Sequence, residues 1–265
     1  MTYPLFDLTG KKALITGSTK GIGREIAEAF ADHGAQVAVC GRKLADAEAA
    51  AADINARVGR EAAFGLAADL MDRTGLIAAH DTAVARMGRI DVLVCNAAMT
   101  PEDYCSMLDY PADGYSKLME GNIVNNAALM SHAARPMKER RDGVILATSS
   151  GGGINPGYST VPYGISKAGL NFLVAGLAAE LAPFNVRVNA VAPGLTRSWS
   201  MEQTMKHNPA AMDVFVSRVP MRRIIEGREI AAGMVFLASE GGKAITGEVI
   251  AMTAGTAGNG APPDV

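Results

Sequence analysis

The chain has few of the features that mark secreted or membrane proteins. Its 265 residues include only three cysteines, with no Cys-x-x-Cys pair, a pattern that favours free thiols in a reducing compartment and a cytoplasmic protein. The N-terminal residues do not combine a basic start with an apolar stretch, so we expect no secretory signal. No later run appears apolar for long enough to cross a bilayer, and we expect no membrane association.

Charge and histidine are also sparse in ways that exclude two classes of partner. The 25 basic and 27 acidic residues nearly balance, and no long basic run provides the attraction that holds proteins to nucleic acid. The four histidines stand in separate segments without ligand spacing, so we expect no metal site. These residues are His33, His80, His132 and His207.

What the chain does have is enough apolar sequence for one large core and an alternation of strand and helix patterns. This alternation predicts a single α/β domain over 1–265, with a Rossmann-like, doubly wound parallel sheet and helices on both faces. The expected strands cover 12–16, 37–40, 62–67, 90–95, 144–148 and 186–191, and the expected helices cover 22–34, 44–58, 72–87, a long stretch around 122, and 161–181. Two segments differ: 195–226 suits a cover over a site, and the tail from about 256 is expected to be flexible.

A glycine-rich turn joins the first strand to the first helix. Gly17, Gly21 and Gly23 allow a tight turn and a close approach to a pyrophosphate, and the helix start supplies free N–H groups. We therefore expect a bound dinucleotide, with Thr19, Lys20 and Ile22 among its contacts. The alternative is an ordinary strand–turn–helix connection.

A tyrosine and a lysine stand four residues apart on the expected helix 161–181. Tyr163 and Lys167 share one helix face, and a nearby ammonium favours the phenolate, which moves the tyrosine towards use as an acid or base at neutral pH. Ser150 lies thirteen residues before the tyrosine. Taken alone, such a pair is in most helices only a half-buried tyrosine packed over a lysine stem.

Together with Pro193-Gly194, these motifs resemble the classical short-chain dehydrogenases/reductases over nearly the whole chain. The resemblance implies hydride transfer between a nicotinamide and a carbonyl or secondary alcohol. Tyr163 would transfer the proton, Ser150 would hydrogen-bond the same oxygen, and Lys167 would also hold the nicotinamide ribose. Asn122 would position a water; otherwise it is a helix asparagine bonding to its own backbone. A homotetramer or dimer built on the helices around Asn122 and Tyr163 is also expected, as in relatives, because both helices carry small residues suited to close packing, at 127–128, 133–134, 175–176 and 178–179.

The resemblance extends to secondary cofactor contacts. Asp69 and Leu70 match an adenine clamp, although Asp69 equally suits the cap of the next helix. The remaining matches are Asn96 and Ala97 beneath the cofactor and Pro193, Gly194, Leu195 and Thr196 beside the carboxamide and pyrophosphate. The segment 252–255 departs from the family pattern, which leaves the C-terminal packing open.

The end of the second strand predicts which nicotinamide cofactor is used. NAD-specific folds place an acid there, and this chain has Gly41 followed by Arg42. Arg42 can stack on adenine and hold a 2′-phosphate, and Lys20 can approach the same phosphate. We therefore expect NADP(H).

Two alternatives stay open at this point. A catalytically silent dinucleotide-binding sensor or scaffold would share the fold. For an enzyme, basic residues of the cover favour a small polar or anionic carbonyl substrate, unless they are only a solvated face. These residues are Arg197, Lys206, His207, Arg218, Arg222 and Arg223, against Glu202 and Asp213.

Overall fold

The computed structural model describes residues 5–101, 105–157, 160–197 and 209–256, the side chains of 209–212 excepted. At its centre lies a seven-stranded sheet in the order β3-β2-β1-β4-β5-β6-β7, and all six pairings of neighbouring strands are parallel. Parallel strands need crossover connections, which the helices provide. The predicted doubly wound parallel sheet is confirmed.

The elements follow the expected order, with boundaries shifted by a few residues. The strands are β1 (Lys12–Ile15), β2 (Gln36–Gly41), β3 (Ala63–Ala67), β4 (Val92–Cys95), β5 (Gly143–Thr148), β6 (Val186–Pro193) and β7 (Val249–Met252). The α-helices are α1 (Gly21–Asp32), α2 (Leu44–Val58), α3 (Arg73–Met87), α4 (Ala112–Met119), α5 (Asn126–Arg140), α6 (Val161–Leu181), α8 (Pro209–Ser217) and α9 (Gly227–Ala238). A π-helix, η1 (Glu120–Asn125), joins α4 to α5, and the 3-10 turns are η2 (Gly151–Gly153), η3 (Ala182–Phe184) and η4 (Glu240–Gly242).

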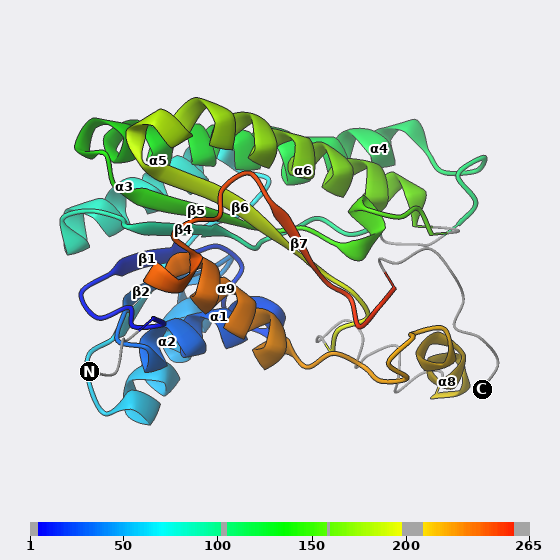
Figure 1. The fold of residues 1–265 in the computed structure, drawn as a ribbon, viewed down its shortest axis with the longest axis horizontal. Coiled ribbons are helices and arrows are strands. Elements are labelled where there is room, and N and C mark those ends of the chain that lie inside the picture. The colour runs from blue at the N-terminus through cyan, green and yellow to red at the C-terminus, as the bar shows by residue number, and fades with distance from the viewer. Residues whose placement is uncertain (1–4, 102–104, 158–159, 198–208, 257–265) are drawn as a thin grey trace.

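Two apolar cores lie on the two faces of the sheet. Helices α1, α2 and α9 cover one face, and α3, α5 and α6 cover the other (Figure 1). Alternate residues of a strand belong to different cores: Ile15 packs with the first group and Leu14 with the second. Burial on both faces explains why the strands read as continuous apolar runs.

The strand order places a crevice between β1 and β4. From β1 the chain proceeds to β2 and β3 on one side, and β4 begins the other half. The carboxyl ends of strands at such a switch point are the usual ligand site of open α/β sheets. The glycine turn follows β1 and Asn96 follows β4, so both lie at this crevice.

The expected cover and tail are described only in part. Within 195–226, the structure describes helix α8 and a parallel bridge between Thr196 and Ile225, while 198–208 lie outside the described residues. The predicted flexible tail lies almost entirely outside them as well. The C-terminal packing is regular, because β7 pairs with β6 from Val249 to Met252.

One helix differs from the expectation that no segment is apolar enough for a bilayer. Residues Val161–Phe184 form 24 helical residues with a hydropathy of 1.3, long and apolar enough to span one by length and composition. Only 33% of its most apolar 18-residue window is buried, and the inner face packs on the sheet and carries the buried Lys167. On the outer face, Phe172 is 83% exposed.

Candidate active site

The glycine turn is fixed to the end of β2 by a buried serine. Ser18 Oγ donates to Ile15 O at 2.7 Å and accepts from Cys40 N at 2.9 Å, and Ser18 N donates to Cys40 O at 2.8 Å. The turn after β1 and the end of β2 therefore form one unit. No pattern in the sequence distinguished Ser18 from the other turn residues.

The absence of side chains at two glycines gives the turn its concave shape. Gly17 has a φ of +62°, and a Cβ there would lie 2.9 Å from Ala97 Cα. A Cβ on Gly23 would lie 2.3 Å from the Gly17 carbonyl oxygen. Lys20 is the N-cap of α1, and its side chain makes no cap bond to the first turn of the helix. This cradle fits a pyrophosphate at the positive end of α1.

Asn96 acts within the protein rather than towards a ligand. Its Nδ2 donates to Thr16 O and Gly17 O, both at 3.1 Å, and its Oδ1 accepts from Thr148 Oγ1 at 3.1 Å. The side chain thus links the glycine turn to the end of β5. The side-chain amide is occupied by these bonds, so Asn96 orders the backbone at the end of β4. Its place beneath a bound cofactor stays a prediction. Ala97 packs against Gly17.

A turn of three glycines holds Ser150 against the helix that carries Tyr163. Ser150 caps η2, and its Oγ accepts from Gly152 N at 3.1 Å, which leaves the hydroxyl proton available for another acceptor. A Cβ on Gly153 would lie 2.8 Å from Lys167 backbone and side-chain atoms, and one on Gly164 would lie 2.5 Å from Gly152 O. The close contact of η2 with α6 therefore requires glycine at these positions.

Lys167 is buried, and its surroundings change its acidity. Its Nζ donates to Thr148 O at 2.8 Å and lies 5.6 Å from the centroid of the Tyr163 ring. Burial lowers the pKa of Lys167 from 10.5 to about 8, against a small raising effect of Cys95. The structure therefore brings the predicted pair together and makes the lysine able to exchange a proton near neutral pH.

Asn122 lies at a break in the helix, as part of the π-helical segment η1. Its Oδ1 accepts from Met99 N at 2.7 Å, and its Nδ2 donates to Met99 O at 2.9 Å and to Ser166 Oγ at 3.0 Å. The side chain therefore bonds neither to its own helix backbone nor to an open space. It joins η1 to the segment after β4 and to α6, and π-turns of this kind are frequent at functional sites.

The predicted adenine clamp forms a tight turn. Asp69 Oδ1 accepts from Met71 N at 2.9 Å, and Leu70 is buried. The cap of α3 is Asp72, whose side chain accepts from Gly75 N, so the proposed capping role of Asp69 is wrong. Asn125 Nδ2 donates to Leu70 O at 2.9 Å, which ties this turn to η1.

The segment after β6 passes close to the C-terminal strand. A Cβ on Gly194 would lie 2.7 Å from Thr253 Cα, so this position admits no side chain. Thr196 is buried and its Oγ1 donates to Gly194 O at 3.0 Å. Pro193 ends β6, and Leu195 is half-buried beside it.

Lys20 and Arg42, the two cations predicted to bind a phosphate, each follow a residue of a contacting pair. A Cβ on Gly41 would lie 2.4 Å from Thr19 Cγ2, so Thr19 and Gly41 are in close contact. Lys20 and Arg42 each come one residue later, and both are exposed. The structure thus places both cations on one rim of the crevice, beside the end of β2.

The surface beside the site includes a hollow of about 400 Å³ behind Met99. Its lining includes apolar and charged side chains of the segment before and within α4, such as Cys105, Tyr110, Asp113 and Lys117. Part of the positive excess predicted for the cover is neutralised, since Arg197 pairs with Glu226 at 3.0 Å and Arg223 with Glu229 at 2.7 Å. The remaining case for an anionic substrate depends partly on Lys206 and His207, which lie outside the described residues.

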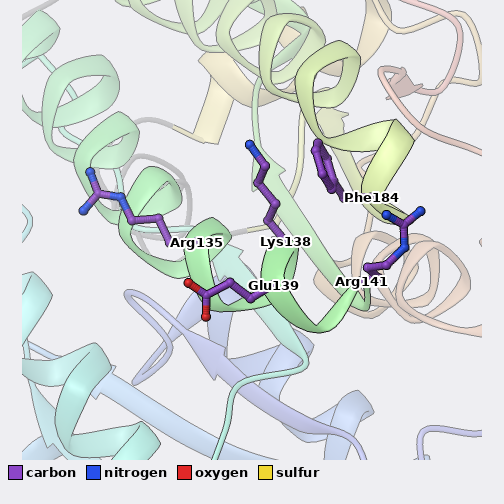
Figure 2. Close-up of a pocket in the computed structure, with 5 residues that line it drawn as sticks. All are labelled: Arg135, Lys138, Glu139, Arg141 and Phe184. Carbon is purple, nitrogen blue, oxygen red and sulfur yellow. The ribbon is translucent and has the colours of Figure 1, made fainter.

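A second hollow, of about 520 Å³, lies far from these residues. Figure 2 shows Lys138 and Arg141 on either side of the Phe184 ring, with Arg135 and Glu139 at the margin. Lys138 Nζ is 4.4 Å from the ring centroid. Phe184 follows the C-terminal end of α6, whereas Tyr163 is in its first turn, roughly 30 Å away along the helix. This hollow is not part of the candidate site.

Sequence reasoning missed the residues that support the catalytic set. Ser149 Oγ donates to Asn171 Oδ1 at 2.5 Å, and Asn171 Nδ2 donates to Gly153 O at 3.1 Å. Asn171 lies one helical turn beyond Lys167, so its position on the same face was a signal available in the sequence. The three consecutive glycines at 151–153 were another.

Comparisons with known proteins agree with this geometry. The family model described as Enoyl-(Acyl carrier protein) reductase matches residues 17–257. Dehydrogenase/reductase SDR family member 4 of Bos taurus is 36% identical over 253 residues, covering 94% of this chain and 88% of the relative.

Two solved structures extend the comparison to complexes. The Pseudomonas aeruginosa RhlG/NADP active-site complex has a TM-score of 0.89 at 29% identity, covering 97% of this chain and 100% of that one. A 7α-hydroxysteroid dehydrogenase complexed with NADH and 7-oxo glycochenodeoxycholic acid has a TM-score of 0.88 at 29% identity, covering 96% and 98%. The glycine cradle, the Ser–Tyr–Lys set and these matches lead to one conclusion: the chain belongs to the short-chain dehydrogenase/reductase family of oxidoreductases, which use a nicotinamide cofactor.

Proposed function

We propose that this protein is an NADP(H)-dependent oxidoreductase that interconverts a carbonyl compound and a secondary alcohol, with Tyr163 as the general acid–base. The observation that carries the proposal is the buried Lys167, whose Nζ lies 5.6 Å from the centroid of the Tyr163 ring and whose pKa is lowered to about 8 by burial. Cofactor binding alone does not require Ser150, Tyr163 and a desolvated Lys167 in combination. The nicotinamide, when bound, supplies or accepts the hydride.

The chain's own residues handle the proton and the substrate oxygen. Tyr163 donates its phenolic proton to that oxygen in reduction and accepts it in oxidation. Ser150, whose Oγ already accepts from Gly152 N, donates to the same oxygen and stabilises the charge that develops on it. Lys167 in its charged form stabilises the phenolate left after transfer.

Asn122 has a positioning role in this scheme. Both N–H groups of its amide are used by Met99 O and Ser166 Oγ, so the side chain holds η1, the segment after β4 and α6 together. The main-chain carbonyl oxygen of Asn122 has two lone pairs, of which one accepts from Asn126 Nδ2 at 3.1 Å and the second can accept from a water. We propose that this lone pair orients the water that resupplies the proton through Lys167.

The preference for NADP(H) is supported by the rim formed by Lys20 and Arg42. The contact of Thr19 with Gly41 leaves little room for the acidic side chain that NAD-specific folds place after β2. Two cations converging on a 2′-phosphate plausibly contribute about 3 kcal/mol, or roughly a hundredfold preference. The solved relatives include both an NADP complex and an NADH complex, so the choice depends on such local contacts.

Assembly into a dimer or tetramer is supported by the outer face of α6. Phe172 is 83% exposed and Ile165 46% exposed on a helix with a mean hydropathy of 1.3 over its most apolar 18-residue window. The small residues predicted to form the interface fall into two groups. Ala133, Ala134 and Ala178 are buried in the subunit's own core, whereas a Cβ on Gly176 would have no atom within 4 Å, so this position is open. A second copy covering the exposed part would bury this apolar surface.

A cytoplasmic location remains part of the proposal. The three cysteines are free, and burial raises the pKa of both Cys40 and Cys95 to about 12. Thiols of this kind are stable as core residues in a reducing compartment.

The test of the proposed reaction is Tyr163→Phe, which removes only the transferable proton. Turnover, followed by the absorbance of the reduced cofactor across ketones, sugar acids, steroids and acyl thioesters, should fall by roughly 10²–10⁴-fold while cofactor affinity is kept. A variant with near-normal turnover would remove Tyr163 from the mechanism. Cofactor binding without turnover of any substrate, in parent and variant alike, would favour the sensor or scaffold.

A further inference from the structure

Two helices on one face of the sheet bring together a histidine–carboxylate–histidine cluster outside the candidate site. His80 and Asp81 belong to α3 and His132 belongs to α5, with Asp81 and His132 51 residues apart in the sequence. Asp81 Oδ1 lies 3.0 Å from His80 Nδ1 and 2.6 Å from His132 Nε2. The imidazole rings meet edge to face with centroids 4.9 Å apart. The histidines are far apart in the sequence, which argued against a metal site, but the packing of α3 on α5 brings His80 and His132 together.

The geometry of the cluster suits a metal ion. One ligand atom from each residue lies within 4.8 Å of the other two. Four-coordinate zinc, with bonds of about 2.0–2.1 Å, separates its ligand atoms by about 3.3 Å. Small rotations of the two more exposed side chains, Asp81 and His132, would bring the three atoms to that spacing.

We propose that His80, Asp81 and His132 form a binding site for a divalent transition-metal ion of the zinc type. Two imidazole nitrogens and one carboxylate oxygen match Zn²⁺, Ni²⁺ or Cu²⁺, whereas Mg²⁺ and Ca²⁺ prefer oxygen ligands alone. The side chain of Asp81 is 57% exposed, so an ion can enter from solvent and keep water in its remaining position. His132 lies ten residues beyond Asn122, roughly 15 Å along the helix. The ion would therefore clamp α3 to α5 and take no part in the chemistry at Tyr163.

The test is zinc binding to the full chain, measured without reference to turnover. A Cys105→Ser background removes a partly exposed thiol that would also bind zinc. Isothermal titration with zinc chloride near neutral pH should show one ion per chain, and His132→Ala should weaken binding at least tenfold. At about a hundredfold excess over the dissociation constant, zinc should raise the Tm of the background protein by roughly 5–10 °C.

Two further variants keep the test decisive. Asp81→Asn keeps the shape of the side chain and removes its charge, so it should also weaken zinc binding, and it serves if His132→Ala does not fold. His33→Ala removes an exposed imidazole that bonds only Ala29 O among the described residues, and the variant should bind zinc like the background protein. The absence of one-to-one binding up to millimolar zinc, or undiminished binding by His132→Ala and Asp81→Asn, would overturn the proposal.

Discussion

The buried Lys167 makes a quantitative prediction about stability and pH. Its pKa is about 8 in the folded protein against 10.5 for an ordinary lysine, because burial disfavours the ammonium. A pKa gap of roughly 2.5 corresponds, at about 1.4 kcal/mol for each pKa unit, to roughly 3 kcal/mol. Below about pH 8 the folded protein must hold a charged lysine in its core, so this free energy opposes folding at neutral pH.

The sign of the pH dependence follows from proton binding. Between about pH 8 and 10.5, the unfolded chain keeps the proton of Lys167 while the folded chain has released it. The free energy of unfolding therefore rises with pH in this window, at up to about 1.4 kcal/mol per pH unit. In Lys167→Met this contribution is absent. The free energy of unfolding of the parent minus that of the variant should then rise by roughly 3 kcal/mol from about pH 7 to 10.5.

Subtracting the free energy of unfolding of Lys167→Met from that of the parent cancels the contributions of the other titrating groups. The buried Cys40 and Cys95 also titrate in alkali, but they are present in both proteins and cancel to first order. Loss of the donor to Thr148 O destabilises the variant by a similar amount at every pH, so it shifts the difference without changing its slope. Only the slope tests the burial of the lysine.

The assay is urea unfolding without cofactor, at constant protein concentration, across this pH range. Lys43→Met, at an exposed lysine, is the matched control and should give a flat difference. A flat difference for Lys167→Met, within about 0.5 kcal/mol, would refute the reasoning, because the lysine would then not be desolvated in the folded protein.

Three further predictions follow from other parts of the structure. The triple variant of Arg42→Leu, Gly41→Asp and Thr19→Ser should shift the ratio of kcat/KM for NADH to kcat/KM for NADPH by roughly a hundredfold towards NADH. Thr19→Ser is included because it removes the methyl group 2.4 Å from the new Cβ. An unchanged ratio would exclude Arg42 from phosphate binding. Phe172→Glu should reduce the mass seen by light scattering, whereas a parent that is already monomeric would contradict the assembly. Ala254→Gly, at a φ of +50°, should raise the free energy of unfolding by up to about 1 kcal/mol in urea, and a loss of stability would show that the methyl group packs usefully.

Local patterns in the sequence predicted most of the fold and which residues of the proposed catalytic set lie close together. Helix 161–181 and helix 44–58 were predicted with their observed boundaries, because apolar periodicity and helix ends are encoded within the segments themselves. The Tyr163–Lys167 pair also needed only helical spacing. Helix α9 was not predicted, although its capping box at Glu226 and Glu229 is a local signal that the sequence carries.

What could not be predicted depends on contacts between distant segments. Nothing near Asn122 in the sequence shows that Met99 would use its side chain, and nothing near Arg197 shows that Glu226 would neutralise it. The bonds of the Asn96 amide and the contact between the histidines of α3 and α5 could not be predicted for the same reason. Such pairings arise only once the sheet order determines which loops and helices are neighbours. Charge counts and residue types alone therefore do not show which polar side chains are already paired within the protein.

The ties among the strand ends have a consequence for ligand binding. Ser18 fixes the glycine turn to β2, and Asn96 fixes it to β5 through Thr148, by side-chain bonds that need no ligand. A cradle held in this way loses little conformational entropy when it binds a pyrophosphate. Amide hydrogen exchange of the turn should accordingly be slow without cofactor and change little on binding, so that this part of the protein acts as a rigid template.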